Sequence, residues 1–139
     1  MEVVRWLHRD RFDQRQNRFN RVAFRNSGID GGISVSECDC VHRIGYATGS
    51  EICEHAREAY LKRGIRAVSD PPIYWKFDSS ILPEGNQITP DPTDFDPCHS
   101  NITGVSDDAC SALLKSKSLS DFMICDENGP RALLRSDLP

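Results

Sequence analysis

The sequence predicts a small α+β domain with a mostly antiparallel sheet, two main helices and long loops. Two segments have apolar stripes at helical spacing and capping residues at their N-terminal ends. Several short stretches are rich in β-branched and aromatic residues, and long loops separate these elements, unlike the short connections of a repeating βαβ barrel. A chain of 139 residues is long enough to bury one core. We therefore expect one domain over residues 1–126 and a flexible C-terminal tail at residues 127–139.

The N-terminal third is expected to contain two strands separated by basic and glycine-rich segments. Residues 2–8 are rich in valine and tryptophan, which predicts a strand. Residues 9–21 are polar and arginine-rich and fit either a basic loop or an irregular helix. The glycines of residues 26–32 predict a sharp turn, and a second strand follows at residues 33–36.

The middle of the chain contains the clearest helix, at residues 51–63. Thr48 and Glu51 have the spacing of a capping box, with Ser50 as a rival N-cap, and Gly64 is a stop signal. Residues 65–68 and 73–77 are strand-like. Two prolines lie between these two segments and are expected to interrupt the sheet.

Residues 89–97 contain three prolines and three aspartates, which predict an irregular surface connection. A strand is expected at residues 98–103, with Cys98 on one face and His99 on the other. A second helix is expected at residues 106–117, because Ser106 is a good N-cap and acidic residues follow it directly. Residues 122–125 are expected to form the last strand.

The six cysteines are expected to be reduced thiols in a cytoplasmic protein. The first residues lack the apolar run of an export signal, and cysteine-rich disulfide scaffolds are usually shorter chains with such a signal. No apolar run is long enough to cross a bilayer, so we expect no membrane partner.

Charge is distributed unevenly along the chain. Residues 1–25 contain seven arginines and three acids, so they carry +4 while the remainder of the chain carries −8. The basic N-terminal region and the acidic middle of the chain either face each other, within the fold or across a homodimer, or bind a partner protein. A nucleic acid is an alternative partner for the arginines. The candidate partner-binding residues are Arg9, Arg11, Arg15, Arg18, Arg21, Arg25, Asp91, Asp94 and Asp96.

A zinc site is one alternative, with Cys38, Cys40 and His42 as its ligands. Structural zinc ligands are usually paired with about two to four residues between them, whereas one residue separates each neighbouring pair here. We therefore expect no metal or other cofactor, and regard buried or incidental thiols as the simpler interpretation.

Catalytic chemistry is a second alternative. His99 or Arg5 would hold a pyrophosphate, and Ser27, Ser34 or Ser36 would orient a ribose. An acid such as Glu37 or Glu51 would polarise the ribose hydroxyl. This set resembles, in residue types and order, the plan of small ADP-ribosyltransferase-like domains, which implies NAD as the bound molecule. The simpler interpretation is that Arg5 belongs to the arginine-rich region and that His99 is a half-buried strand histidine bonded to backbone.

Three short segments carry a further resemblance. They are Ala23-Phe24-Arg25, Gly32-Ile33-Ser34-Val35 and Asp96-Pro97-Cys98-His99-Ser100-Asn101-Ile102. Together they resemble a set of small bacterial proteins with an Ala-Phe…Gly-Leu-Ser-Val segment and a later Asp-Pro-x-His-x-x-Ile segment. That set has no established activity, so the resemblance implies a small bacterial domain and assigns no catalytic residue.

These observations favour a small bacterial binding or accessory module that contacts a macromolecular partner through its arginine-rich N-terminal region and the acidic loop region at residues 78–108. The alternative is an effector enzyme that acts on a nucleotide or nucleic acid. An enzyme predicts a concave site that contains His99, an arginine and a carboxylate or hydroxyl group. A binding module predicts a charged surface instead.

Overall fold

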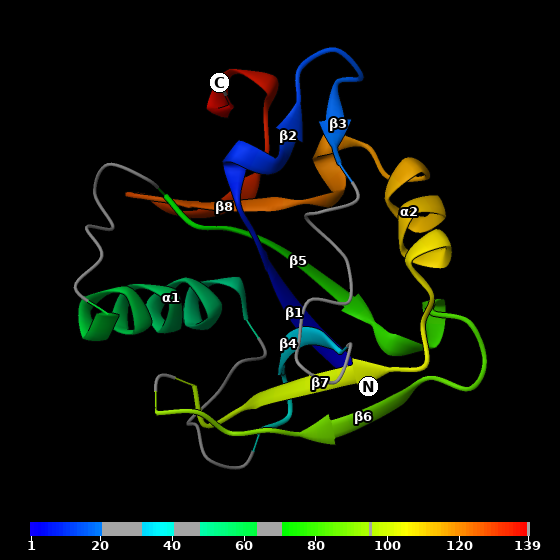
Figure 1. Ribbon diagram of the computed structural model, residues 1–139. Coiled ribbons are helices and arrows are strands. Elements are labelled where there is room, and N and C mark those ends of the chain that lie inside the picture. The colour runs from blue at the N-terminus through cyan, green and yellow to red at the C-terminus, as the bar shows by residue number, and fades with distance from the viewer. Residues whose placement is uncertain (21–31, 41–47, 64–70, 95, 139) are drawn as a thin grey trace.

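A seven-stranded antiparallel sheet forms the centre of the computed structural model, which describes residues 1–20, 32–40, 48–63, 71–94 and 96–138 (Figure 1). Its strand order is β6-β7-β4-β1-β5-β8-β9. The strands are β1 (Glu2–Leu7), β4 (Ile33–Glu37), β5 (Ile73–Asp78), β6 (Gln87–Pro90), β7 (His99–Thr103), β8 (Met123–Asp126) and β9 (Gly129–Ala132). The helices are α1 (Gly49–Arg63) and α2 (Asp107–Lys115), and β2 (Phe12–Asp13) pairs with β3 (Arg18–Phe19) in a separate hairpin. Short 3-10 turns occur at Arg9–Arg11, Ser79–Ile81, Leu119–Asp121 and Arg135–Asp137. The predicted α+β class is confirmed.

Two buried clusters lie on opposite faces of the sheet because side chains alternate along each strand. On β1, Val3 and Leu7 join the large core, whereas Val4 joins the small core. The α2 face of the sheet carries the large core, which includes residues of α2 and of the β2–β3 hairpin. The α1 face carries the small core, formed by Val4, Cys38, Ile52, Cys53, Tyr74 and Cys125.

Aromatic rings fasten the hairpin to the α2 face. Phe12 and Phe19 meet edge to face with ring centroids 5.6 Å apart, and Phe19 meets Phe122 at 5.2 Å. Phe122 in turn contacts the ring of Trp75 on β5 at 5.9 Å. The two-residue strands therefore keep their position through buried aromatic contacts, since so short a pair of strands is not stable alone.

Both predicted helices are confirmed, and each begins at the expected cap. The Thr48 hydroxyl accepts from the backbone N–H of Glu51 at 3.2 Å and donates to the Glu51 carboxylate at 3.0 Å. The Ser106 hydroxyl accepts from the backbone N–H of Ala109 at 3.1 Å. Gly64 and the expected strand at residues 65–68 lie outside the described residues.

The strand expected after the acidic loop (residues 89–97) is confirmed as β7. The first residues of that loop, however, belong to a strand themselves, β6. Residues Gln87–Pro90 pair with β7, so the prediction that the irregular connection begins at residue 89 is wrong. Pro90 is tolerated because β6 is an edge strand, where a missing backbone N–H breaks no ladder on the outer side.

The expected flexible tail is also wrong for the described residues up to 138. Residues Gly129–Ala132 pair with β8, and the side chain of Leu133 is buried in the large core. The guanidinium of Arg131 donates to the carboxylates of Asp126 on β8 and of Asp137 near the C-terminus, so it links these two parts of the chain. The segment is held by backbone pairing, apolar burial and charged hydrogen bonds.

Four of the six cysteines form disulfides, which corrects the expectation of reduced thiols. Cys40 is bonded to Cys98, with Cα atoms 5.4 Å apart, and Cys53 is bonded to Cys125, with Cα atoms 5.5 Å apart. Each pair spans a long stretch of sequence, 58 and 72 residues respectively, and only the folded sheet brings the partners together. The remaining two, Cys38 and Cys110, are buried free thiols.

Candidate functional site

The best sequence candidate, His99, lies on the α1 face of β7 in a small polar cluster. Its Nδ1 atom is 2.8 Å from the backbone carbonyl oxygen of Asp91. A carbonyl can only accept, so Nδ1 carries the proton and a neutral ring presents Nε2 as an acceptor. Asn101 donates to the Asp91 carboxylate at 2.9 Å and so holds this loop against β7. The imidazole, with 19% of its side chain exposed, is oriented by backbone, as the simpler interpretation of His99 predicted.

Arg5 does not join that cluster. It lies between Val3 and Leu7 on β1, so its side chain is on the α2 face, and its guanidinium donates to the backbone carbonyl of Ser34 at 2.9 Å. His99 is on the opposite face, because its neighbours Ser100 and Ile102 point toward the α2 face. Burial lowers the pKa of Arg5 from its ordinary value. The two residues therefore cannot grip one phosphate group together.

Ser34 and Glu51 complete the predicted catalytic set. Ser34 pairs with Asn101 across β4 and β7, so it shares the α1 face with His99. Glu51 lies in the first turn of α1, where its carboxylate accepts from the Thr48 hydroxyl. The structure thus brings the Ser34 side chain near the His99 cluster and uses Glu51 in the cap of α1. Arg5 contacts Ser34 through the backbone carbonyl.

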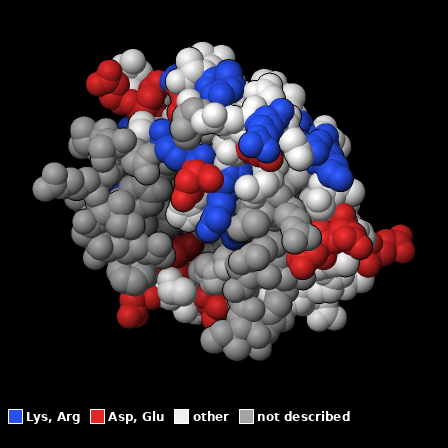
Figure 2. All heavy atoms as spheres, turned by 45° about the horizontal axis from the view of Figure 1, so that its top comes forward, with Lys and Arg blue, Asp and Glu red and all other residues white. Residues whose placement is uncertain are grey.

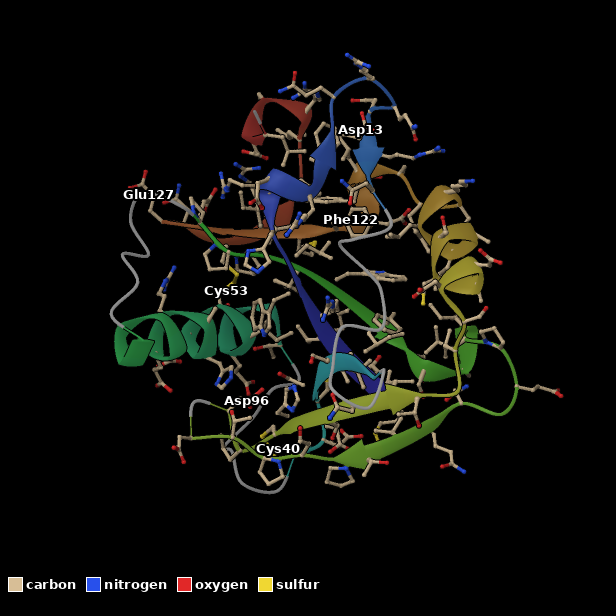
Figure 3. All side chains as sticks on the ribbon, viewed as in Figure 1. Asp13, Cys40, Cys53, Asp96, Phe122 and Glu127 are labelled. Carbon is tan, nitrogen blue, oxygen red and sulfur yellow. A yellow bond between two sulfur atoms is a disulfide. The ribbon has the colours of Figure 1, made fainter. Side chains whose placement is uncertain are left out.

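A buried polar network, not predicted from the sequence, lies beside the Cys40–Cys98 disulfide (Figure 3). Asp96 is at its centre: one carboxylate oxygen accepts from the Ser36 hydroxyl, and the other is 3.5 Å from Nε2 of His55 and accepts from the Cys98 N–H at 2.9 Å. The carboxylate separates the hydroxyl from the imidazole, so the ring is not placed to activate Ser36 as a nucleophile. The network instead anchors the acidic loop to α1 and β4.

This placement changes the role of Asp96, which was a candidate partner-binding residue. Its exposed fraction is 9%, whereas Asp91 and Asp94 are exposed. The spacing of Asp96 and Cys98 is that of an Asx turn, in which a side-chain oxygen accepts a backbone N–H two residues later. That local signal was present in the sequence, but the contacts with Ser36 and His55 were not predictable from neighbouring residues.

The zinc alternative loses one donor to a disulfide, because the Cys40 sulfur is bonded to Cys98. Burial raises the pKa of the Cys38 thiol to about 11, so this sulfur stays protonated at neutral pH and is a poor metal ligand. His42 lies outside the described residues. Among the residues that are described, no three His, Cys, Asp or Glu side chains form a metal-binding group.

The arginines of the N-terminal region have two different roles. The Arg9 guanidinium donates to the backbone carbonyls of Pro71 and Asp137, so it links the N-terminal region to the segment before β5 and to the C-terminal segment. Arg11 and Arg15 are exposed on and next to the hairpin. Arg21 and Arg25 lie outside the described residues. We define the basic surface as Arg11, Arg15, Arg18, Lys115 and Arg135, and Figure 2 shows lysine and arginine side chains gathered over this end of the molecule.

The acidic loop lies at the other end of the fold. Figure 1 shows the β2–β3 hairpin and the β6–β7 pair at opposite ends, and Figure 3 shows the same for Asp13 and Asp96. Within the fold, the hairpin arginines therefore do not face the part of the acidic region at residues 89–97, whereas α2, which begins with Asp107 and Asp108, contacts β3. A contact between the two regions across a homodimer stays a prediction.

A groove of about 240 Å³ lies between the hairpin and α2. It contains Arg18 and not His99, so it does not match the concave site that an enzyme with His99 requires. Its lining residues are Asp13, Gln16, Arg18, Phe19, Asn20, Ser111, Leu114 and Lys115. Apart from Phe19 and Leu114 these side chains are polar or charged, so the groove suits a small charged group better than an apolar ligand.

No described helix has the length and apolar content needed to cross a membrane. Comparison with known proteins assigns no function: no family model, curated protein or solved structure matches the chain. The candidate sites therefore rest on the geometry of this chain alone.

Proposed function

We propose that the chain is a binding module whose basic surface contacts an acidic macromolecular partner. The observation that carries this proposal is the gathering of lysine and arginine side chains at the hairpin end of the fold (Figure 2), which lies opposite the β6–β7 pair (Figure 1). Arg11 and Arg15 are exposed, while Asp91 and Asp94 lie at the far end. Cations that are not neutralised by the acidic loop are available to steer an anionic partner toward the hairpin.

The aromatic anchoring of the hairpin supports this proposal. Phe19 is 2% exposed and contacts both Phe12 and Phe122, so the short hairpin is fixed on the large core. A fixed backbone presents its arginines with less loss of conformational entropy on binding than a free loop would. The hairpin is therefore suited to recognition rather than to loose electrostatic attraction.

The disulfides bear on the compartment. Disulfides persist in oxidising environments and are rare in the reducing cytosol. The Cys40–Cys98 and Cys53–Cys125 bonds therefore favour an oxidising compartment over the cytoplasmic location expected from the sequence. In this proposal the partner meets the protein after oxidative folding.

A second candidate function is catalysis by His99, and one observation favours it. The Asp91 carbonyl fixes the imidazole with Nδ1 as the donor, so Nε2 is an acceptor oriented by backbone. An imidazole held in this way can act as a general base. The test is hydrolysis of NAD and of RNA by the wild type and by His99→Ala; equal rates for the two proteins would remove this candidate.

The main proposal is tested by binding to an acidic polypeptide. The probe is fluorescent oligoglutamate, and its affinity is measured by anisotropy over a range of salt concentrations. Replacing Arg11 and Arg15 together by Gln should weaken binding about 3- to 10-fold, because two exposed ion pairs are lost. Salt should weaken wild-type binding because exposed charges are screened beyond about 10 Å.

The matched control removes two positive charges from the other side of the sheet. Arg57→Gln with Lys76→Gln leaves the hairpin unchanged, since Arg57 is on α1 and Lys76 pairs with Glu2. This control should bind oligoglutamate like the wild type. Association that ignores salt, or equal losses in both double variants, would overturn the proposal.

A further inference from the structure

We propose that the groove between the hairpin and α2 is a subsite for one carboxylate side chain of the acidic partner protein, held by Arg18 and Lys115. This inference rests on the proposed function and specifies where a carboxylate of the partner binds and which side chains hold it. The groove joins segments nearly one hundred residues apart in sequence, and its two cations come from different elements, β3 and α2.

Arg18 is held in one orientation before any partner arrives. The side-chain oxygen of Gln16 accepts from Nε of Arg18 at 2.9 Å and from a second guanidinium nitrogen. This contact fixes the guanidinium plane and leaves its remaining N–H groups, and the amide nitrogen of Gln16, to donate elsewhere. A pre-oriented planar donor group suits a carboxylate, which accepts two parallel N–H groups.

The wall formed by α2 adds a second charge and an apolar floor. Lys115 is exposed and Ser111 is half-buried, so both can reach a ligand in the groove. Leu114 and Phe19 are nearly fully buried and line the same groove. The methylene groups of a glutamate side chain can pack on that floor while its carboxylate meets the two cations.

The size of the groove limits what it can hold. Its volume of about 240 Å³ lies below the usual range for small-molecule pockets, which is about 300–1,000 Å³. A whole dinucleotide such as NAD would not fit within it, whereas one side chain would. The groove is therefore matched to a single group on a larger partner.

The charge of the groove favours a singly charged carboxylate over a phosphate monoester, which carries about two negative charges. Arg18 and Lys115 contribute two positive charges and Asp13 one negative charge, so the net charge suits a singly charged anion. Asp13 is required locally, since its carboxylate accepts from the backbone N–H groups of Arg15 and Gln16 at 2.9 and 3.2 Å. Phe19 is buried, so it offers no ring on which a nucleic-acid base could stack.

The experiment compares single substitutions with the oligoglutamate probe at constant ionic strength. Arg18→Gln should weaken binding about tenfold, because a charged, pre-oriented hydrogen-bond donor is lost. Lys115→Gln should weaken it about threefold, since a flexible ammonium group acts as a point charge. The matched control is Arg15→Gln on the same hairpin and outside the groove, which should cost only about twofold.

A gain-of-function variant gives an independent readout. Asp13→Asn keeps a side-chain oxygen that can accept from the turn but removes the negative charge from the groove. Its affinity for oligoglutamate should rise about threefold, and competition by inorganic phosphate should become stronger. Thermal unfolding of each variant checks that the hairpin remains folded.

The outcomes separate this inference from the proposed function. In one outcome, Arg18→Gln and Arg15→Gln weaken oligoglutamate binding equally while the double variant of Arg11 and Arg15 still binds more weakly than the wild type. That result would support the basic surface as the binding site and overturn the groove proposal. Tighter binding to oligothymidylate than to oligoglutamate would also overturn it in favour of a nucleic acid. A tenfold loss in Arg18→Gln together with a gain in Asp13→Asn is the supporting result.

Discussion

The two faces of the sheet are stabilised by different kinds of interaction. The α2 face has a large aromatic core, in which Phe19 and Trp75 both contact Phe122. The α1 face has a small core of six buried residues, three of which are cysteines. A small core removes less apolar surface from water, so covalent links contribute more to its stability. The comparison shows how one sheet can combine a packed face with a cross-linked face.

Reduction of both disulfides is expected to have the largest effect. Each bond closes a loop of 58 or 72 residues, and loops of this size correspond to about 4 kcal/mol per bond. Together they approach the whole free energy of unfolding of a typical domain, about 5–15 kcal/mol. Urea denaturation with and without reductant should therefore show a large fall in the midpoint. An unchanged midpoint would mean that the fold is stable without its two cross-links.

Phe19→Ala is expected to destabilise the other face by about 3–5 kcal/mol, because a buried aromatic ring is replaced by a cavity. The ring lies against Phe12 and Phe122, so its loss should also free the hairpin. Urea denaturation measures the change in unfolding free energy, with Phe19→Leu as a milder control. A cost below that of Phe19→Leu would show that aromatic packing does not hold this face.

Asp96→Asn is expected to lower the free energy of unfolding by about 2 kcal/mol. The charged acceptor shared by Ser36 and His55 is lost, while most of the shape of the side chain is kept. The matched control is Asp94→Asn, two residues earlier on the exposed part of the loop, which should change stability by less than about 0.5 kcal/mol. Equal midpoints for the two variants would remove the buried network as a stabilising feature of the α1 face.

Acid should have the smallest effect, and it acts through the C-terminal segment. Hydrogen bonds from Arg131 lower the pKa of Asp126 and Asp137 below the ordinary value of 3.8. The stabilisation that these two carboxylates contribute is fully present above their pKa in the unfolded chain. It is lost as the pH falls through their lower pKa in the folded protein. The melting temperature should decline below about pH 4 and decline less in Arg131→Gln. Arg135→Gln, as the control, should follow the wild type.

Local signals in the sequence were enough to predict several elements. The caps Thr48 and Ser106 were predictable because a capping residue bonds within its own first turn. The alternation along β7 was predictable because strand side chains alternate regardless of partner. The fold class followed from these elements and from the long loops between them.

The errors came from signals that have more than one structural meaning. Pro90 predicts an irregular loop, although a proline is also compatible with the outer side of an edge strand such as β6. The sequence predicts a tail from residue 127 onward, but Asn128 and Gly129 lie at the turn that joins β8 to β9, where Gly129 has a φ of +107°. An Asn-Gly pair between two apolar runs is a strong hairpin signal.

The candidate sites depended on contacts between distant segments. Arg5 and His99 belong to strands that are not adjacent in the sheet and point to opposite faces, which no local pattern specifies. The cysteine pairs and the Asp96 network likewise join segments that are distant in sequence, and the groove depends on how the separate hairpin packs beside α2. Strand order is set by the packing of the whole core, so these features appear only in the folded chain.

The positions of two prolines have a consequence for how copies of this protein meet. The open sheet has two outer strands, β6 and β9, and each includes a proline, Pro90 and Pro130. An outer strand with all its amides invites another chain to extend the sheet, which is a route to aggregation. Each proline removes one donor from such an edge. Each edge therefore offers fewer amide donors to a second copy, and we expect this to disfavour edge-to-edge polymerisation in concentrated solution.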